Sequence, residues 1–153
     1  MQTIWITGGS SGIGFATAKE FLSNGWRVVI SSSNEEKLKN AKNRLIDQKH
    51  AGKLHIVPCD ISKIKDVNNT IDYIETKLGK INIALLNASA YSPNKDQIFD
   101  INNYELLVDV NIKGTLFCIN RLKDYMSGRN NTIAIISSPL GYRGWPTAGA
   151  YGI

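Results

Sequence analysis

The stretch that decides the fold is TIWITGGSSGIG, residues 3–14. Every residue from 3 to 7 is β-branched or aromatic, which predicts a strand, and Gly8 ends it. Apolar residues then recur at helical spacing until Gly25, so the pattern predicts a helix over residues 14–24. A strand, a glycine-rich turn and a helix in this order are typical of the first unit of a parallel α/β sheet.

Strands and helices continue to alternate along the rest of the chain. Asn34 is expected to cap a helix whose first turn carries Glu35 and Glu36. The alternation predicts an α/β protein of Rossmann type, with a doubly wound parallel sheet of strand order 3-2-1-4-5 between two layers of helices. Further strands are expected beyond residue 153. The predicted segments are strands at residues 27–31, 54–57, 81–86 and 132–137, and helices after residue 34, at 64–78 and at about 104–126.

The composition fits one globular domain over residues 1–153, with 42% hydrophobic and 20% charged residues. The net charge of +5 comes from lysines and arginines scattered along the chain, without a block of like charge. This pattern favours solvated helix faces over a nucleic-acid surface, so no nucleic-acid partner is expected.

Two cysteines, Cys59 and Cys118, lie far apart without CxxC spacing or a partnering histidine. The pattern argues against a zinc site or a disulfide framework, and we expect no metal and a reducing, cytoplasmic location. The first strand begins at residue 3 and no apolar run approaches the length of a membrane span, so neither a signal peptide nor a membrane partner is expected.

The turn after the first strand has the features of a phosphate site. Backbone N–H groups from Gly9 to Ile13 and the positive end of the following helix are expected to hold a diphosphate. Glycine permits both the tight turn and the close approach of the phosphate. A glycine-rich turn can also be purely structural, but the position of this one, after the first strand and before the first helix, favours a dinucleotide site.

Residues 7–14, TGGSSGIG, resemble the TGxxxGxG cofactor motif of the short-chain dehydrogenase/reductase family, and the resemblance covers the whole chain. Cys59-Asp60-Ile61 resembles the acidic turn that touches the adenine ring in that family. Residues 86–90, LNASA, resemble its NNAG element but lack the doubled asparagine and the glycine. The cofactor-binding residues that the resemblance implies are Gly8, Ser10, Ser11, Gly12, Ile13, Gly14, Ser32, Ser33, Asp60, Ile61, Asn87, Ala88 and Ser89.

The resemblance also implies three catalytic residues. Asn111 begins a segment similar to the NxxG of the family's long helix, and Ser138 and Tyr151 have the spacing of its active-site serine and tyrosine. Tyr151 would exchange a proton with the substrate oxygen, Ser138 would hydrogen-bond that oxygen, and Asn111 would steady a water relay. Each residue alone also has an ordinary structural explanation, and Tyr142 is the competing tyrosine.

The family's YxxxK motif would place a lysine at position 155, and the sequence ends at Ile153. An ammonium about 4 Å from the phenolate contributes about 4 kcal/mol at an effective dielectric of 20, enough to make the tyrosine a usable base. We therefore expect the gene product to continue, with the lysine and further strands. The alternatives are a catalytically inactive dinucleotide-binding module and, with little support from the short loops, an epimerase or dehydratase.

The end of the second strand bears on the choice of cofactor. Many family members have an acidic residue there that selects NAD, whereas this sequence has Ser31, Ser32 and Ser33. No carboxylate would repel a 2′-phosphate and hydroxyls could donate to it, but no arginine or lysine occupies the usual phosphate-pairing positions, Ser11 and Ser33. NADP is therefore preferred, with NAD as the alternative.

The resemblance implies a small carbonyl or alcohol substrate and a homodimer or homotetramer formed through the long helix. That helix carries more apolar residues than one stripe facing the sheet requires: Leu107, Val108, Leu116, Phe117, Ile119 and Leu122. Three aromatic residues, Tyr91, Tyr142 and Trp145, are candidates for lining a substrate pocket, and packing is the alternative for each.

Overall fold

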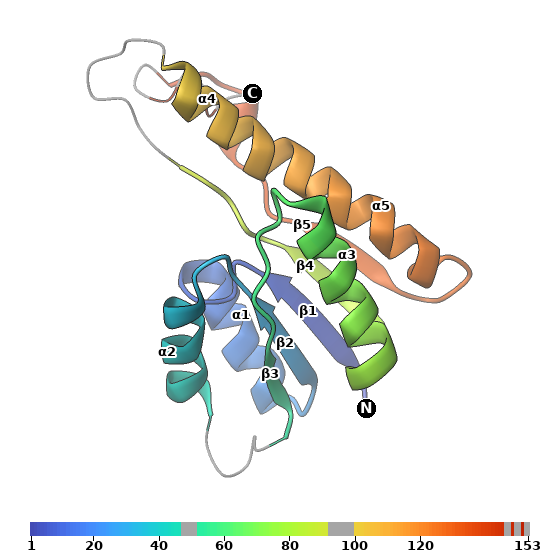
Figure 1. Ribbon diagram of the computed structural model, residues 1–153. Coiled ribbons are helices and arrows are strands. Elements are labelled where there is room, and N and C mark those ends of the chain that lie inside the picture. Colours follow the sequence, from blue (N-terminus) through green and yellow to red (C-terminus); the bar gives the residue numbers. More distant parts are fainter. Residues whose placement is uncertain (47–51, 92–99, 146–147, 149–150, 152–153) are drawn as a thin grey trace.

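The computed structural model describes residues 1–46, 52–91, 100–145, 148 and 151, and it shows a parallel sheet covered by helices on both faces (Figure 1). The strand order is β3-β2-β1-β4-β5, as the sequence predicts, and every pairing is parallel. The strands are β1 (Thr3–Thr7), β2 (Arg27–Ser31), β3 (Leu54–Ile56), β4 (Ile81–Leu86) and β5 (Thr132–Ile135).

The central strand, β1, is buried at all five positions. Because successive side chains of a strand point to opposite faces, β1 serves two cores. Ile4 and Ile6 belong to the core on one face of the sheet, and Trp5 belongs to the core on the other. A β-branched and aromatic run therefore forms the middle of three layers.

The helices α1 (Gly12–Ser23) and α2 (Glu35–Leu45) cover the face that receives Ile4 and Ile6. Ala18 and Leu22 of α1 and Leu38 of α2 are buried there. The predicted cap is confirmed, because Oδ1 of Asn34 accepts a hydrogen bond of 2.8 Å from the backbone N–H of Lys37.

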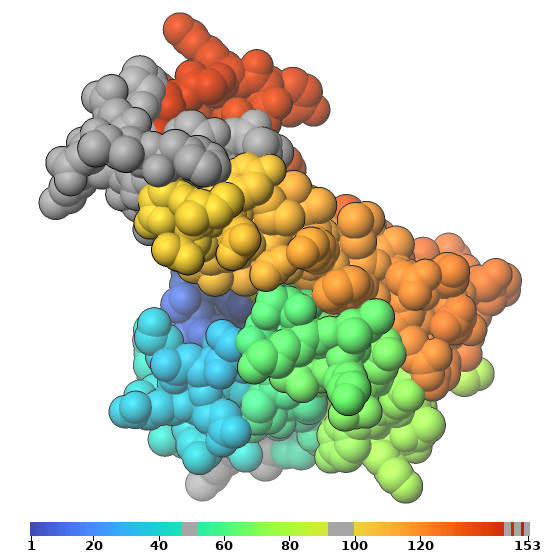
Figure 2. All heavy atoms as spheres, turned by 45° about the horizontal axis from the view of Figure 1, so that its top comes forward, coloured from blue at the N-terminus to red at the C-terminus, as the bar shows by residue number. Residues whose placement is uncertain are grey.

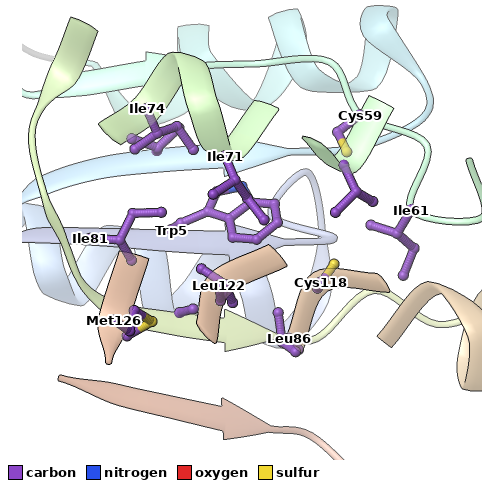
Figure 3. Close-up of a cluster of buried hydrophobic side chains, with 13 residues drawn as sticks. Trp5, Cys59, Ile61, Ile71, Ile74, Ile81, Leu86, Cys118, Leu122 and Met126 are labelled. Carbon is purple, nitrogen blue, oxygen red and sulfur yellow. The ribbon is translucent and has the colours of Figure 1, made fainter. Parts of the chain in front are cut away.

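The helices α3 (Ile64–Tyr73) and α5 (Thr115–Met126) cover the other face. In the close-up of this core the indole of Trp5 lies among Ile71, Ile81 and Leu122 (Figure 3). Trp5 is fully buried, and its Nε1 donates a hydrogen bond of 2.9 Å to Oγ of Ser31 in β2. The indole thus fills the core without leaving its one polar atom unpaired.

Both long helical segments contain a π-helical turn that the sequence pattern did not indicate. α3 continues as η2 (Ile74–Leu78), and α4 (Ile101–Leu107) is joined to α5 by η3 (Val108–Gly114). The second segment therefore begins at Ile101, before the predicted start. A π-turn shifts the backbone hydrogen bonds by one residue without changing which side chains are apolar, so periodicity does not detect it.

Two strands end earlier than predicted. β3 stops at Ile56 and β5 at Ile135, although the backbone N–H of Ile136 still donates to the carbonyl of Leu86 at 3.0 Å. β5 lies at the edge of the sheet, where Ile135 is 51% exposed and Ile136 is 43% exposed. Ala150 and Gly152, the neighbours of Tyr151, lie outside the described residues. No helix in the described parts of the chain is long and apolar enough to cross a membrane.

Candidate functional site

A cleft of about 530 Å³ lies at the carboxyl ends of four parallel strands. Figure 2 shows the dark blue N-terminal residues at the bottom of a hollow between the cyan atoms of α2 and the gold and orange atoms of α4 and α5. All the predicted cofactor residues except Gly14 line the cleft, together with four residues that the sequence did not indicate as cofactor-binding: Asn34, Lys37, Cys59 and Val110.

Gly14 lies beneath the turn instead of in the cleft. A Cβ on this buried glycine would lie 2.6 Å from the carbonyl oxygen of Gly8 and 2.7 Å from Nδ2 of Asn87. Only glycine permits this approach of α1 to the end of β1, so the contacts give the third glycine of the motif a packing role.

Replacing Gly14 with alanine is expected to lower the free energy of unfolding by about 1–3 kcal/mol, because the added methyl group meets backbone that cannot move aside. The loss is expected even though alanine favours helices more than glycine does. Urea denaturation measures it. The matched control is Gly144→Ala, because a Cβ added at Gly144 would have no described atom within 4 Å. Equal free energies of unfolding for the two variants would contradict the packing role of Gly14.

The first turn of α1 is open to an anion. Gly12 has a φ of +54°, and a Cβ there would meet no described atom within 4 Å. Ser11 makes no side-chain capping bond to this turn, and the turn holds no acidic residue. The N–H groups and the positive end of the helix dipole therefore face the cleft without a protein anion, an environment that fits a diphosphate.

Asn87 holds the ends of two strands together. Its Nδ2 donates to the carbonyl oxygens of Thr7 at 3.1 Å and Gly8 at 3.2 Å. In return, Oγ1 of Thr7 accepts from the backbone N–H groups of Asn87 at 2.9 Å and Ala88 at 3.0 Å. Although Asn87 lines the cleft, its side chain is committed to fixing the glycine turn beside β4.

Asp60 is held as a carboxylate at the β3 side of the cleft. Burial raises its pKa, but hydrogen bonds from Ser62 and Lys63 outweigh this effect and leave the pKa below the ordinary value. Oδ1 accepts from the N–H and hydroxyl of Ser62, and Oδ2 lies 3.2 Å from Nζ of Lys63. An ionised acceptor of this kind could receive a hydrogen bond from an amino group such as that of adenine.

The two cysteines are free and buried. Burial raises the pKa of Cys59 to about 11 and that of Cys118 to about 12, so both are thiols at neutral pH. Cys59 lines the cleft as an apolar wall. Among the described residues no group of His, Cys, Asp and Glu is arranged to hold a metal ion.

A second pocket, of about 160 Å³, brings together all three predicted catalytic residues, Asn111, Ser138 and Tyr151. Ala88 and Ser89 line both this pocket and the cleft, so the two spaces adjoin at the end of β4. Tyr142, the competing tyrosine, is 97% exposed and does not line the pocket.

The three side chains differ in how they are held. Asn111 in η3 binds one backbone residue twice, accepting from N–H of Ala90 at 2.8 Å and donating to its carbonyl at 3.0 Å. Oγ of Ser138 accepts from N–H of Leu140 at 3.2 Å and keeps its own hydrogen to donate. The ring of Tyr151 packs edge-on against that of Tyr91, with centroids 4.9 Å apart.

The other two aromatic candidates for the substrate pocket do not line it in the described part of the chain. Tyr142 is almost fully exposed, and Trp145 is 61% exposed. Tyr91 reaches the pocket only through its contact with Tyr151.

The parallel sheet, the glycine turn and the adjoining cleft define a nucleotide-binding protein of Rossmann type. A family model described as short chain dehydrogenase matches residues 2–152, and the chain belongs to this family of oxidoreductases. An uncharacterized oxidoreductase of Staphylococcus aureus is 30% identical over 136 residues, which are 86% of this chain and 57% of the relative. One from Staphylococcus haemolyticus is 32% identical over 117 residues, covering 76% of this chain and 49% of the relative.

Solved structures share the fold. A short chain dehydrogenase from Bacillus anthracis matches with a TM-score of 0.91 and 26% identity, over 99% of this chain and 61% of that one. NAD+-bound xylitol dehydrogenase matches with a TM-score of 0.89 and 23% identity, over 99% of this chain and 58% of that one. The chain thus spans about half to three-fifths of the length of these proteins.

Proposed function

We propose that residues 1–153 form the NAD(P)-binding Rossmann domain of an oxidoreductase that transfers hydride between a nicotinamide and a carbonyl or alcohol, with Tyr151 as acid and base. The observation that carries the proposal is the junction at Ala88 and Ser89. There the cleft beside the glycine turn adjoins the pocket of Asn111 and Ser138, so one elongated ligand could occupy both spaces.

The strand order supplies a direction for that ligand. Going from β3 to β5, the sheet presents Asp60, then Ser32 and Ser33, then the glycine turn, and then Asn87 to Ser89 before the pocket with Ser138. Adenine at the β3 end, diphosphate at the turn after β1 and nicotinamide beyond β4 follow this order. The volume of about 530 Å³ is in the range of clefts that hold small organic ligands.

A bound nicotinamide would supply or accept hydride at the substrate carbon. The hydroxyl of Tyr151 would give its proton to the substrate oxygen in reduction and take it back in oxidation. Ser138, whose hydroxyl hydrogen is uncommitted, would donate to the same oxygen. Asn111 would fix the path of residues 88–90 between the two spaces through its paired bonds to Ala90.

We further propose that the natural gene product continues past Ile153 with a lysine at position 155. The greater length of the matched relatives supports this. A second support is that a tyrosine needs a nearby cation to act as a base. Without that lysine the remaining function is that of a dinucleotide-binding module.

For the assembly we infer a homodimer or homotetramer, supported by exposed apolar residues on α4 and α5: Ile101, Leu106 and Leu116. We place the protein in the cytoplasm, with support from its two free thiols.

Titration of the chain with NADPH and NADH, followed by nicotinamide fluorescence, tests the proposal. Binding of either cofactor with NADPH the tighter, and a substrate-dependent change in nicotinamide absorbance by the full-length protein, are the expected results. Binding without turnover across a broad carbonyl panel would support the inactive module instead. Failure of the folded protein to bind either cofactor would refute the dinucleotide site.

A further inference from the structure

We propose that Lys37 is the residue by which this protein selects NADP, forming a 2′-phosphate subsite with the hydroxyls of Ser32 and Ser33. The inference rests on the proposed dinucleotide site and adds the cation that it needs. Neither Ser11 nor Ser33, the positions where such a cation would be sought in the sequence, provides one. The structure supplies the positive charge from the first turn of α2.

Lys37 is the only cationic residue among the described residues that line the cleft. It lies beside Ser32, Ser33 and Asn34, between the glycine turn of β1 and Asp60 after β3. This is the stretch where the proposed order of the ligand places the adenosine ribose. A dianionic phosphate monoester on the ribose would therefore lie near Lys37, the one cation among the described residues of the cleft lining.

The geometry of α2 explains how Lys37 reaches the cleft. Asn34 is the cap of α2, and the N–H of Lys37 is the group that its side chain holds, at 2.8 Å. Helical side chains lean toward the N-terminus of their helix, so that of Lys37 leans back over residues 33 and 34. Leu38, the next residue, is fully buried against the sheet and fixes the rotation of the helix.

The charge on Lys37 is uncommitted. It forms no ion pair with any residue that the structure describes, and it is exposed to the cleft. Neighbouring charges are already paired: Lys39 lies 3.8 Å from Glu35, and Lys63 lies 3.2 Å from Asp60. An incoming phosphate would therefore not have to displace a carboxylate from Lys37.

Two hydroxyls complete the subsite. Oγ of Ser32 accepts from the N–H of Asn34 at 3.3 Å, which leaves its hydrogen free to donate, and Ser33 is exposed. Ser31 takes no part, because it is buried and its Oγ accepts from Trp5. The end of β2 thus offers hydroxyl donors and an ammonium, with no carboxylate from the strand.

Measuring the dissociation constants of NADPH and NADH for the wild-type chain and for Lys37→Gln tests the inference. Loss of a charge-assisted contact should raise the dissociation constant of NADPH about tenfold and leave that of NADH almost unchanged. Lys37→Gln should also weaken the binding of adenosine 2′,5′-bisphosphate about tenfold relative to that of adenosine 5′-monophosphate. Neither nucleotide carries a nicotinamide, so this comparison measures the contribution of the 2′-phosphate alone. Lys37→Arg should restore most of the preference.

The matched control is Lys39→Gln, which removes the same charge two residues along α2 from a lysine outside the cleft lining. It should leave the ratio of the two dissociation constants at the wild-type value. Two results would overturn the role of Lys37 while leaving the dinucleotide site intact. One is an equal change in the dissociation constants of NADPH and NADH for Lys37→Gln, and the other is an equal effect of Lys37→Gln and Lys39→Gln on the ratio of these constants. Absence of all nucleotide binding in the folded wild type would instead overturn the proposed function.

Discussion

Replacing Tyr151 with phenylalanine in the full-length protein is expected to lower kcat by at least about 100-fold while the dissociation constant of the cofactor stays near the wild-type value. The hydroxyl is the group proposed to exchange a proton with the substrate, and general acid or base catalysis is typically worth about 100-fold or more. Phenylalanine keeps the ring that packs against Tyr91 at 4.9 Å, so the pocket should retain its shape.

Tyr142→Phe is the matched control, because it removes the same hydroxyl from a side chain that is 97% exposed and outside the pocket. Its kcat should equal that of the wild type. Steady-state kinetics with a fluorescence titration of the cofactor separates chemistry from binding. A Tyr151→Phe enzyme with normal kcat, or a greater loss in Tyr142→Phe, would reject Tyr151 as the acid and base.

Replacing Trp5 with alanine is expected to lower the free energy of unfolding by about 3–5 kcal/mol, a large part of the stability of a typical domain. Trp5 is fully buried at the centre of the sheet, and its removal leaves a cavity among Ile71, Ile81 and Leu122. It also deprives the buried Oγ of Ser31 of its donor, the indole N–H at 2.9 Å. Cofactor binding in the cleft should weaken as well, because β1 carries the glycine turn.

Trp145→Ala makes the same chemical change at a side chain that is 61% exposed, and its effect should stay within about 0.5 kcal/mol. Urea denaturation of both variants, read by circular dichroism, gives the comparison. Similar losses in the two variants would contradict the central place of Trp5 in the core.

Local pattern was sufficient to predict the order of the strands and helices and the glycine turn. The β-branched run from Thr3 to Thr7 and the glycines after it indicated both the strand and the turn, because strand propensity and turn chemistry act over neighbouring residues. The cap at Asn34 was predictable for the same reason. The family resemblance then indicated further site residues, and fourteen of them, from Ser10 to Tyr151, line the cleft or the pocket.

Contacts between distant parts of the chain were not predictable in this way. Gly114 lies where a Cβ would be 2.8 Å from Cγ1 of Ile61, and Asn87 holds the carbonyls of Thr7 and Gly8. Each depends on the packing of separate elements. The π-helical turns were missed because they change backbone hydrogen bonds and leave the apolar pattern intact.

The sequence by itself determined the order of strands and helices, the parallel sheet and the glycine turn before α1, since these follow from periodicity and backbone conformation within short segments. Only the tertiary structure decided which side chains share a space. It placed Lys37 in the cleft, separated Tyr151 from Tyr142, and turned Ser31 into the core while Ser32 and Ser33 face the cleft. The physical reason is that a site is made by converging strand ends, and their convergence depends on the packing of both cores around β1.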